Sequence, residues 1–277
     1  MSALPASPAG AAAAPVTVPG LQRMKREGVR IVSTTAYDFS FARLLDKAGV
    51  DLLLVGDSLG MVIQGHSTTL PVTLEQMIYH TAAVVRGARR AMVVCDMPFG
   101  FCHGGGVAVM DAAVRVLKET GCHGVKLEGG VRMAETIRFL WEQQVPVLAH
   151  VGLTPQSVHA FGGFKVQGRG EDAERVMADA VAVAEAGAFA VVLEGIPAPL
   201  ARRITERLEI PTIGIGAGGQ CDGQVLVMHD LLGIYEEVVP RFVKCYLPDR
   251  TVFHAVGRFV DDVRSGQFPT EEHSFTE

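Results

Sequence analysis

The chain has 277 residues, of which 48% are hydrophobic, and it carries a formal net charge of −5 at pH 7. A chain of this length can bury a sizeable core within one α/β domain. The mild negative charge and the lack of a Lys/Arg run argue against nucleic acid as a partner, because a polyanion needs a basic surface.

The cysteines are odd in number and scattered along the chain, without a CxxC pair: Cys95, Cys102, Cys122, Cys221 and Cys245. This spacing argues against both a disulfide framework and a zinc knuckle. A reducing compartment fits this pattern, and we expect a cytoplasmic protein.

The first twenty residues are rich in Ala and Pro and contain no charged side chain. They lack the basic and apolar segments of a secretory signal and the arginines of a transit peptide, so we expect a flexible leader over residues 1–20. Residues 21–277 are predicted to form one catalytic domain. No apolar run reaches the roughly 18 residues of a membrane-spanning helix, so no membrane is expected.

From residue 30 onward, short β-branched runs alternate with longer amphipathic stretches, a pattern typical of parallel strands joined by helical crossovers. Thr73 and Gln76 have the spacing of a capping box at a helix start. The predicted strands are 30–37, 51–57, 91–96, 124–128, 146–150, 190–194 and 211–216, with 225–231 as the weakest candidate for an eighth. The predicted helices are 41–48, 73–88, 107–120, 133–143, 171–186, 199–208 and 252–264.

This succession of units predicts a single-domain (β/α)₈ TIM barrel and not an open doubly wound sheet. No G-x-G-x-x-G follows the first strand, and GIGAGG at 214–219 is only a weak match to a dinucleotide-binding motif. The Gly-rich stretch 153–170 is too long for an ordinary turn, so it predicts a functional lid or binding loop.

Polar side chains follow five successive predicted strands at the points where the strands end. In a TIM barrel these ends open on the active-site face. One acid in such a position is as often a helix cap or turn residue, but a cap does not account for the whole series. The series is Asp57 and Ser58, then Asp96, then Lys126 and Glu128, then His150, then Glu194.

Three of these acids suggest a metal site. Asp57, Asp96 and Glu128 would repel one another in a partly dry site without a hard divalent cation. Their oxygen ligands favour Mg²⁺ over zinc, and Cys95 alternates away from Asp96, as expected of a thiol in the core.

Lys126 and Glu128 are two positions apart on one strand, so their side chains are predicted to point the same way. A cation beside the three acids can attract a carboxylate substrate that the acids repel. His150 has two open interpretations, as a hydrogen-bonded wall residue or as a functional group.

Two strings raise the alternative of a serine hydrolase. GDSLG at 56–60 fits the nucleophile elbow G-x-S-x-G, and HGGG at 103–106 is similar to an oxyanion loop. In hydrolases the HGGG loop precedes the serine, whereas here it follows. Ser58 is therefore expected to contact an anionic substrate through its hydroxyl or backbone N–H.

Seven segments together resemble the ketopantoate hydroxymethyltransferase family, which opens pantothenate biosynthesis. They span the chain from about residue 20 to its end and are specific in sequence. They are TAYDFSFA at 35–42, VGDSLGMVIQGHSTTLPVT at 55–73, VKLEGG at 125–130, GLTPQSVHAFGGFKVQGRG at 152–170, IGIGAG at 213–218, DGQVLVMHDLLG at 222–233 and EEHSF at 271–275.

The resemblance implies a (β/α)₈ barrel in which Asp57, Asp96 and Glu128 hold Mg²⁺. Asp57, Ser58, Asp96 and Lys126 would bind 3-methyl-2-oxobutanoate, and Glu194 would be the proton acceptor that forms a magnesium-stabilised enolate. The implied co-substrate is 5,10-methylenetetrahydrofolate, the products are 2-dehydropantoate and tetrahydrofolate, and the assembly is a homodecamer.

The sequence departs from the family at FGFCHGGG, residues 99–106, where a Ser-Tyr pair is more usual after Pro-Phe. This puts the contacts of that loop in doubt, but not the metal. The leader also lacks a family counterpart.

Two further alternatives remain. A magnesium-dependent oxo-acid lyase or mutase of the isocitrate lyase type would use similar barrel chemistry, but the Lys-Lys-Cys-Gly-His string of the lyase branch is missing. A catalytically inactive scaffold would not need the intact acids Asp57, Asp96, Glu128 and Glu194.

Overall fold

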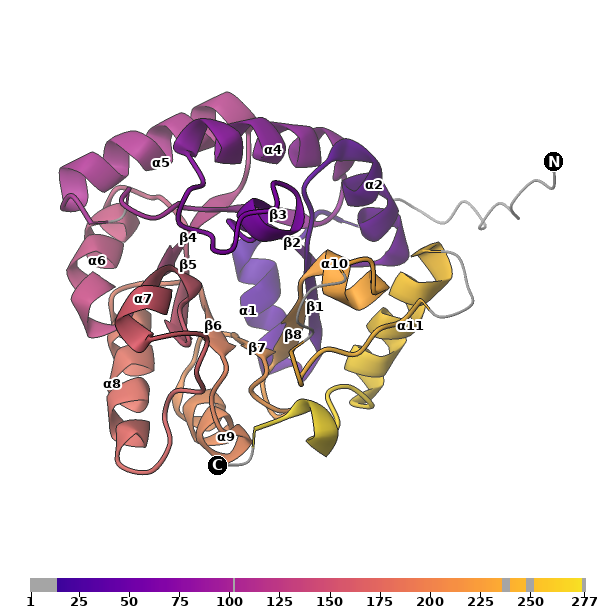
Figure 1. Cartoon of the computed structure of the whole chain (residues 1–277). Coiled ribbons are helices and arrows are strands. Elements are labelled where there is room, and N and C mark those ends of the chain that lie inside the picture. The colour runs from indigo at the N-terminus through magenta and orange to yellow at the C-terminus, as the bar shows by residue number, and fades with distance from the viewer. Residues whose placement is uncertain (1–13, 102, 236–239, 248–251, 276–277) are drawn as a thin grey trace.

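The protein folds as a closed barrel of parallel strands, seen in the computed structural model, which describes residues 14–101, 103–235, 240–247 and 252–275. The strands pair in chain order, and the last closes on the first (Figure 1). This confirms the predicted (β/α)₈ TIM barrel. The strands are β1 (Ile31–Thr35), β2 (Leu52–Val55), β3 (Met92–Asp96), β4 (Gly124–Glu128), β5 (Val147–Gly152), β6 (Ala190–Glu194), β7 (Thr212–Ile215) and β8 (Gly223–Leu226).

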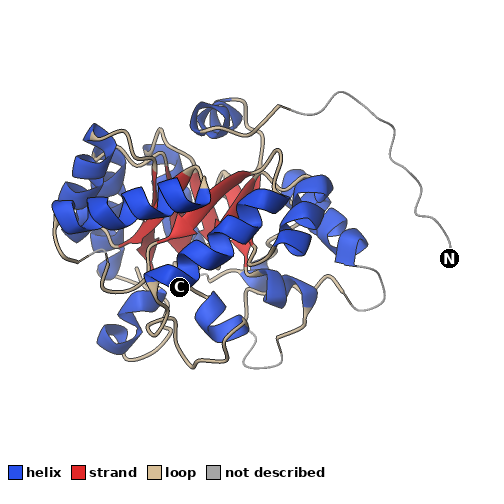
Figure 2. Ribbon diagram, turned by 90° about the horizontal axis from the view of Figure 1, so that it is seen from above, coloured by secondary structure: helices blue, strands red, loops and turns tan. Residues whose placement is uncertain are grey.

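Helices flank the strands (Figure 2). The seven predicted helices are all present, with ends within two residues of the predicted ones. They are α2 (Phe39–Ala48), α4 (Leu74–Gly87), α5 (Gly106–Thr120), α6 (Ala134–Glu142), α8 (Asp172–Glu185), α9 (Ala198–Arg207) and α11 (Val252–Ser265). The predicted capping box is confirmed at the start of α4, where Thr73 Oγ1 accepts from Gln76 N at 3.2 Å and Gln76 Oε1 accepts from Thr73 N at 2.8 Å.

Shorter helices were not predicted. They are α1 (Val18–Arg26), α3 (Leu59–Val62), α7 (Val158–Phe161) and α10 (Met228–Leu232), with 3-10 turns η1 (Val131–Met133), η2 (Pro155–Ser157) and η3 (Glu271–His273). The stretch 153–170 thus contains η2 and α7.

The predicted eighth strand, 225–231, is wrong in its second half. Strand β8 ends at Leu226 and α10 follows, because Thr35 Oγ1 accepts from Met228 N at 2.9 Å and draws that backbone out of the sheet. In an apolar run of this length, hydrophobic periodicity cannot distinguish a strand from a helix. The strand also begins earlier than predicted, at Gly223, where a Cβ would lie 2.5 Å from the carbonyl oxygen of Ile31.

Helix α1 packs at the N-terminal end of the barrel. Its Leu21 is fully buried and joins the apolar cluster inside the barrel, which includes the first residues of several strands, such as Ile31 and Met92. Lys25 fixes the helix through bonds of 2.7 Å to Asp222 and 3.0 Å to the carbonyl of Thr205. The helix begins at Val18, two residues before the predicted end of the leader at residue 20, and residues 1–13 lie outside the described residues.

Strand alternation sorts side chains into two layers. On β4, Val125 and Leu127 face the outer core between strands and helices, whereas Lys126 and Glu128 share the other face. Cys95 also lies in the outer core, as predicted. The barrel interior is therefore apolar at its N-terminal end and polar at its C-terminal end, where a site can form.

Among the described residues, no helix combines the length and the apolarity needed to cross a bilayer.

Candidate active site

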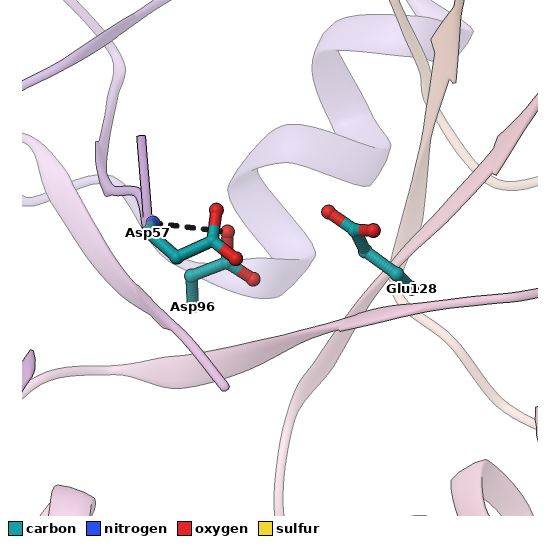
Figure 3. A group of neighbouring side chains, drawn as sticks. All are labelled: Asp57, Asp96 and Glu128. Atoms are coloured by element: carbon teal, nitrogen blue, oxygen red, sulfur yellow. Dashed lines mark hydrogen bonds between the residues drawn. The ribbon is translucent and has the colours of Figure 1, made fainter. Parts of the chain in front are cut away.

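Three buried carboxylates meet at the C-terminal ends of neighbouring strands. Asp57 follows β2, Asp96 ends β3 and Glu128 ends β4, and each offers an oxygen within 4.8 Å of the other two. Figure 3 shows Asp57 and Asp96 side by side, with Glu128 reaching toward them from a separate strand. The backbone N–H of Asp57 donates to Asp96 Oδ2 at 3.4 Å. The sequence analysis predicted this group as metal ligands, and the fold brings all three together.

Lys126 lies among these acids. Strand register places it beside Asp96, and its Nζ lies 2.7 Å from both oxygens of that carboxylate. The same nitrogen lies 3.4 Å from Glu128 Oε1, as expected from two inward positions on one strand. One ammonium group thus serves two carboxylates in a site closed to solvent.

The charge balance of the cluster appears in its pKa values. Burial, with Asp96 and Glu128 nearby, raises the pKa of Asp57 well above its ordinary range. Burial also raises the pKa of Asp96, although Lys126 opposes the change. Burial by itself would raise the pKa of Glu128, but Lys126 and His150 lower it to about 2. The site has more acid than Lys126 can neutralise.

Burial disfavours the ammonium form of Lys126, yet the surrounding carboxylates of Asp96, Glu128 and Asp57 raise its pKa above the ordinary lysine value. Lys126 is therefore a permanent cation at physiological pH. A fixed positive charge at the closed end of the site can receive an anionic group.

His150 and Glu194 extend the site along the next two strands. His150 Nε2 lies 3.2 Å from Glu194 Oε2, and its Nδ1 lies 3.5 Å from Glu128 Oε1, without good hydrogen-bond alignment in either contact. Burial and Lys126 disfavour a charged His150, but Glu128 and Glu194 raise its pKa to about 9. The imidazole thus stands as a cation between the two acids.

Glu194 differs from the three clustered acids in position and exposure. It ends β6, and its side chain remains 15% exposed, against 3–4% for those of Asp96 and Glu128. It is not a member of the group whose oxygens converge. A carboxylate that is outside the cluster but at its edge can act on a molecule that the cluster binds.

Ser58 sits between β2 and α3, so the GDSLG string does form a strand-turn-helix. Its Oγ lies 2.9 Å from the hydroxyl of Tyr37, which is fully buried. Burial raises the pKa of Tyr37 despite that contact, so the phenol stays protonated. A serine nucleophile needs a base, and the partner that the structure gives this hydroxyl is a neutral phenol.

Two residues at the site were missed by the sequence analysis. Tyr37 ends the first predicted strand, so the strand-end rule could have found it. Gln156, from the loop after β5, donates its side-chain N–H to Asp57 Oδ2 at 2.9 Å and its backbone N–H to Glu128 Oε2 at 3.0 Å. No local motif signals those contacts, because they join segments far apart in sequence.

The divergent loop at 99–106 leads into α5, which begins at Gly106. Phe99 and Phe101 are exposed, and the rings of Phe99 and His103 lie 5.4 Å apart. Cys102 lies outside the described residues. A Cβ at Gly106 would lie 2.9 Å from Phe139, so the glycine allows α5 to start close to α6.

A family model described as ketopantoate hydroxymethyltransferase matches residues 15–271. The chain belongs to the ketopantoate hydroxymethyltransferase family. This confirms the predicted family and the prediction that the protein is an enzyme.

Two relatives are similar to the chain over nearly its whole length. The 3-methyl-2-oxobutanoate hydroxymethyltransferase of Magnetococcus marinus is 58% identical over 262 residues, which cover 94% of this chain and 98% of that protein. The protein of the same name from Trichlorobacter lovleyi is 56% identical over 262 residues, with the same coverage of 94% and 98%.

Solved structures show which other proteins share the barrel. Phosphonopyruvate hydrolase matches with a TM-score of 0.60 at 14% identity, over 80% of this chain and 85% of that one. The 2,3-dimethylmalate lyase, a member of the PEP mutase/isocitrate lyase superfamily, matches with a TM-score of 0.56 at 18% identity, over 79% and 81%. At these identities the likeness is one of fold alone, so it does not support a lyase or mutase activity for this chain.

Proposed function

We propose that this protein transfers a hydroxymethyl group from 5,10-methylenetetrahydrofolate to 3-methyl-2-oxobutanoate, giving 2-dehydropantoate and tetrahydrofolate. The relatives carry the name of this activity, and they match 94% of the chain. The observation that carries the proposal is the division of labour among the acids. Asp57, Asp96 and Glu128 converge with Lys126, while Glu194 stands apart at the edge.

The three converging acids fit a hard divalent cation. Their donor atoms are all carboxylate oxygens, the ligands that Mg²⁺ prefers. The raised pKa values of Asp57 and Asp96 show that gathering these acids in a buried site costs free energy, which a cation would offset. When bound, Mg²⁺ supplies Lewis-acid stabilisation of the negative charge that develops on a 2-oxo acid as its C3 proton leaves.

Lys126 and Ser58 are placed to bind the substrate carboxylate directly, and we assign them to that role. Asp57 and Asp96 are also assigned to substrate binding, because they would hold the substrate through the cation. Lys126 offers a buried ammonium group. Ser58 offers a hydroxyl whose oxygen can accept from Tyr37, leaving its own proton free to donate to the substrate. A carboxylate held by both donors would be fixed in orientation, which lowers the entropic cost of reaching the transition state.

Glu194 is assigned as the base. The C3–H bond of the bound oxo acid breaks, its proton goes to the carboxylate of Glu194, and the electron pair remains on the substrate as an enolate. One C–N bond of the folate methylene bridge breaks to open an iminium ion, and C3 attacks its methylene carbon. Water then displaces the remaining folate nitrogen, so that its oxygen becomes the hydroxyl group and the nitrogens of tetrahydrofolate keep the protons. His150, at 3.2 Å, limits the positions open to Glu194.

A direct assay tests this function. Purified protein with Mg²⁺, methylenetetrahydrofolate and 3-methyl-2-oxobutanoate should release tetrahydrofolate and 2-dehydropantoate in equal amounts. Omitting the oxo acid should stop the release. Release of tetrahydrofolate without 2-dehydropantoate, or no release with the complete mixture, would contradict the proposal.

We further propose that the enzyme is a cytoplasmic homodecamer, following the family. Sedimentation at micromolar concentration should give a decameric mass. A monomeric mass would contradict this assembly.

A further inference from the structure

Gln156 joins the loop after β5 to two of the acids in the cluster. The residue is buried, at 6% exposure, in the η2 turn. Its Nε2 donates to Asp57 Oδ2 and to the carbonyl of Met97, each at 2.9 Å. Its backbone N–H donates to Glu128 Oε2 at 3.0 Å. One residue thus holds carboxylates that come from different strands.

The amide of Gln156 has only one sensible orientation. Both hydrogens of Nε2 are taken by acceptors, one a carboxylate and the other a backbone carbonyl. Turning the amide over would place Oε1 against these same two acceptors, leaving three oxygens without a proton between them. The side chain therefore acts as a two-pronged donor, anchored to the Met97 carbonyl on one side.

These bonds constrain one oxygen of each acid. A carboxylate with a free side chain must lose rotational freedom when it binds a cation, whereas one already held by a donor has lost most of it. Gln156 donates to Oδ2 of Asp57 and to Oε2 of Glu128, one oxygen of each carboxylate. Donors that hold the ligands of a metal site typically change metal affinity 10- to 100-fold.

We propose that Gln156 is a positioning residue that holds Asp57 and Glu128 in the arrangement that binds the divalent cation. This inference rests on the proposed role of these acids as metal ligands. It also gives the loop at 153–170 a task, because the backbone of that loop bonds at Leu153 to the carbonyl of Glu194 at 2.8 Å. The loop thus contacts both the metal-binding acids and the strand that carries the base.

The test is Gln156→Met, which keeps the length of the side chain and removes both donors. Mn²⁺ affinity, measured by electron paramagnetic resonance on metal-depleted full-length protein, should weaken about 10- to 100-fold. The backbone N–H of residue 156 still holds Glu128 in this variant, so binding should not be abolished. Saturating Mn²⁺ should then restore the rate of C3 proton exchange, since the ligands themselves are intact.

A control from the same loop is Gln167→Met. The Gln167 side chain donates to the carbonyl of Lys165 and accepts from Arg175, and neither contact reaches the acids. Its Mn²⁺ affinity should match the wild type. Thermal unfolding of the metal-free proteins shows whether Gln156→Met is folded, and Gln156→Ala, which introduces no new apolar group, replaces it if it is not.

The outcomes separate the two proposals. Weakened Mn²⁺ binding in Gln156→Met, with normal binding in Gln167→Met, supports the inference. Wild-type affinity in Gln156→Met or in Gln156→Ala overturns it and leaves the metal site itself intact. Failure of the wild-type protein to bind Mn²⁺ at all would overturn the metal site and, with it, the role given to Gln156.

Discussion

Lys126→Met removes the buried cation of the site and should destabilise the metal-free protein strongly. The lysine side chain is 4% exposed, and its Nζ contacts Asp96 at 2.7 Å and Glu128 at 3.4 Å. Met has a similar shape, so little of the effect comes from a cavity. Removing one member of a buried ion pair leaves the other uncompensated and costs about 3–5 kcal/mol.

The loss of stability in Lys126→Met should depend on pH, and it should become smaller as the pH falls. In the wild type, burial by itself would raise the pKa of Glu128. Lys126 and His150 outweigh burial and hold this pKa at about 2. Without Lys126, the carboxyl pKa values of the folded state rise above those of the unfolded chain. The folded variant then binds more protons than the unfolded chain between about pH 4 and the raised pKa values, so its stability increases as pH falls through that window. The gap between variant and wild type should therefore be largest near neutral pH.

Urea unfolding with a chelator present, near pH 7.5 and near pH 5, measures both effects. Lys118→Met is the control, because Lys118 is exposed on α5 and its replacement should change stability by no more than about 0.5 kcal/mol. A loss below about 1 kcal/mol for Lys126→Met near pH 7.5 would contradict the role of Lys126 as a buried partner of the acids, because a loss of that size is typical of a surface ion pair. A gap that widens toward acid pH would also refute it.

Three further predictions concern the metal and the serine. Chelation should abolish transfer and added Mg²⁺ should restore it, because the clustered acids leave the cation open to substrate; full turnover of metal-free protein would contradict this. Asp96→Ala should weaken magnesium-dependent binding of 3-methyl-2-oxobutanoate in calorimetry, since one hard ligand and its charge are removed, and unchanged binding would count against Asp96 as a ligand. Ser58→Ala should keep part of the activity, and the wild type should resist fluorophosphonate, because Ser58 contacts substrate without attacking it; stoichiometric labelling at Ser58 would revive the hydrolase alternative.

Much of the fold follows from local periodicity. Strand β4 shows why, since its alternation alone places Lys126 and Glu128 on one face and Val125 and Leu127 on the other. The same logic fails after β8, where the apolar run into Met228 fits strand and helix equally. There the outcome depends on a hydrogen bond that the backbone N–H of Met228 donates to Thr35, which lies near the other end of the chain.

The site also contains residues that could be predicted from the sequence and contacts that could not. Asp57, Asp96 and Glu128 could be found because each closes a strand, and parallel strands end at one face of a barrel. Their distances from Lys126 could not, because these depend on the register between β3 and β4, which pairs Asp96 with Lys126. The contacts of Gln156 were equally hidden, since they depend on how a long loop folds back over the barrel.

Removal of the C3 proton of the oxo acid is the chemical step assigned to Glu194. Incubating 3-methyl-2-oxobutanoate with enzyme and Mg²⁺ in D₂O, without folate, isolates this step, and NMR follows the loss of the C3 proton signal. Glu194→Gln keeps the shape of the side chain but cannot accept a proton. Glu206→Gln, at an exposed position on α9 paired with Arg202, controls for loss of a carboxylate elsewhere.

Exchange by Glu194→Gln should fall by roughly 10²- to 10⁴-fold, the usual contribution of a positioned general base. Calorimetry should show that Mg²⁺ and the oxo acid still bind this variant, and Glu206→Gln should exchange like the wild type. Wild-type exchange in Glu194→Gln would contradict the assignment of Glu194 as the base.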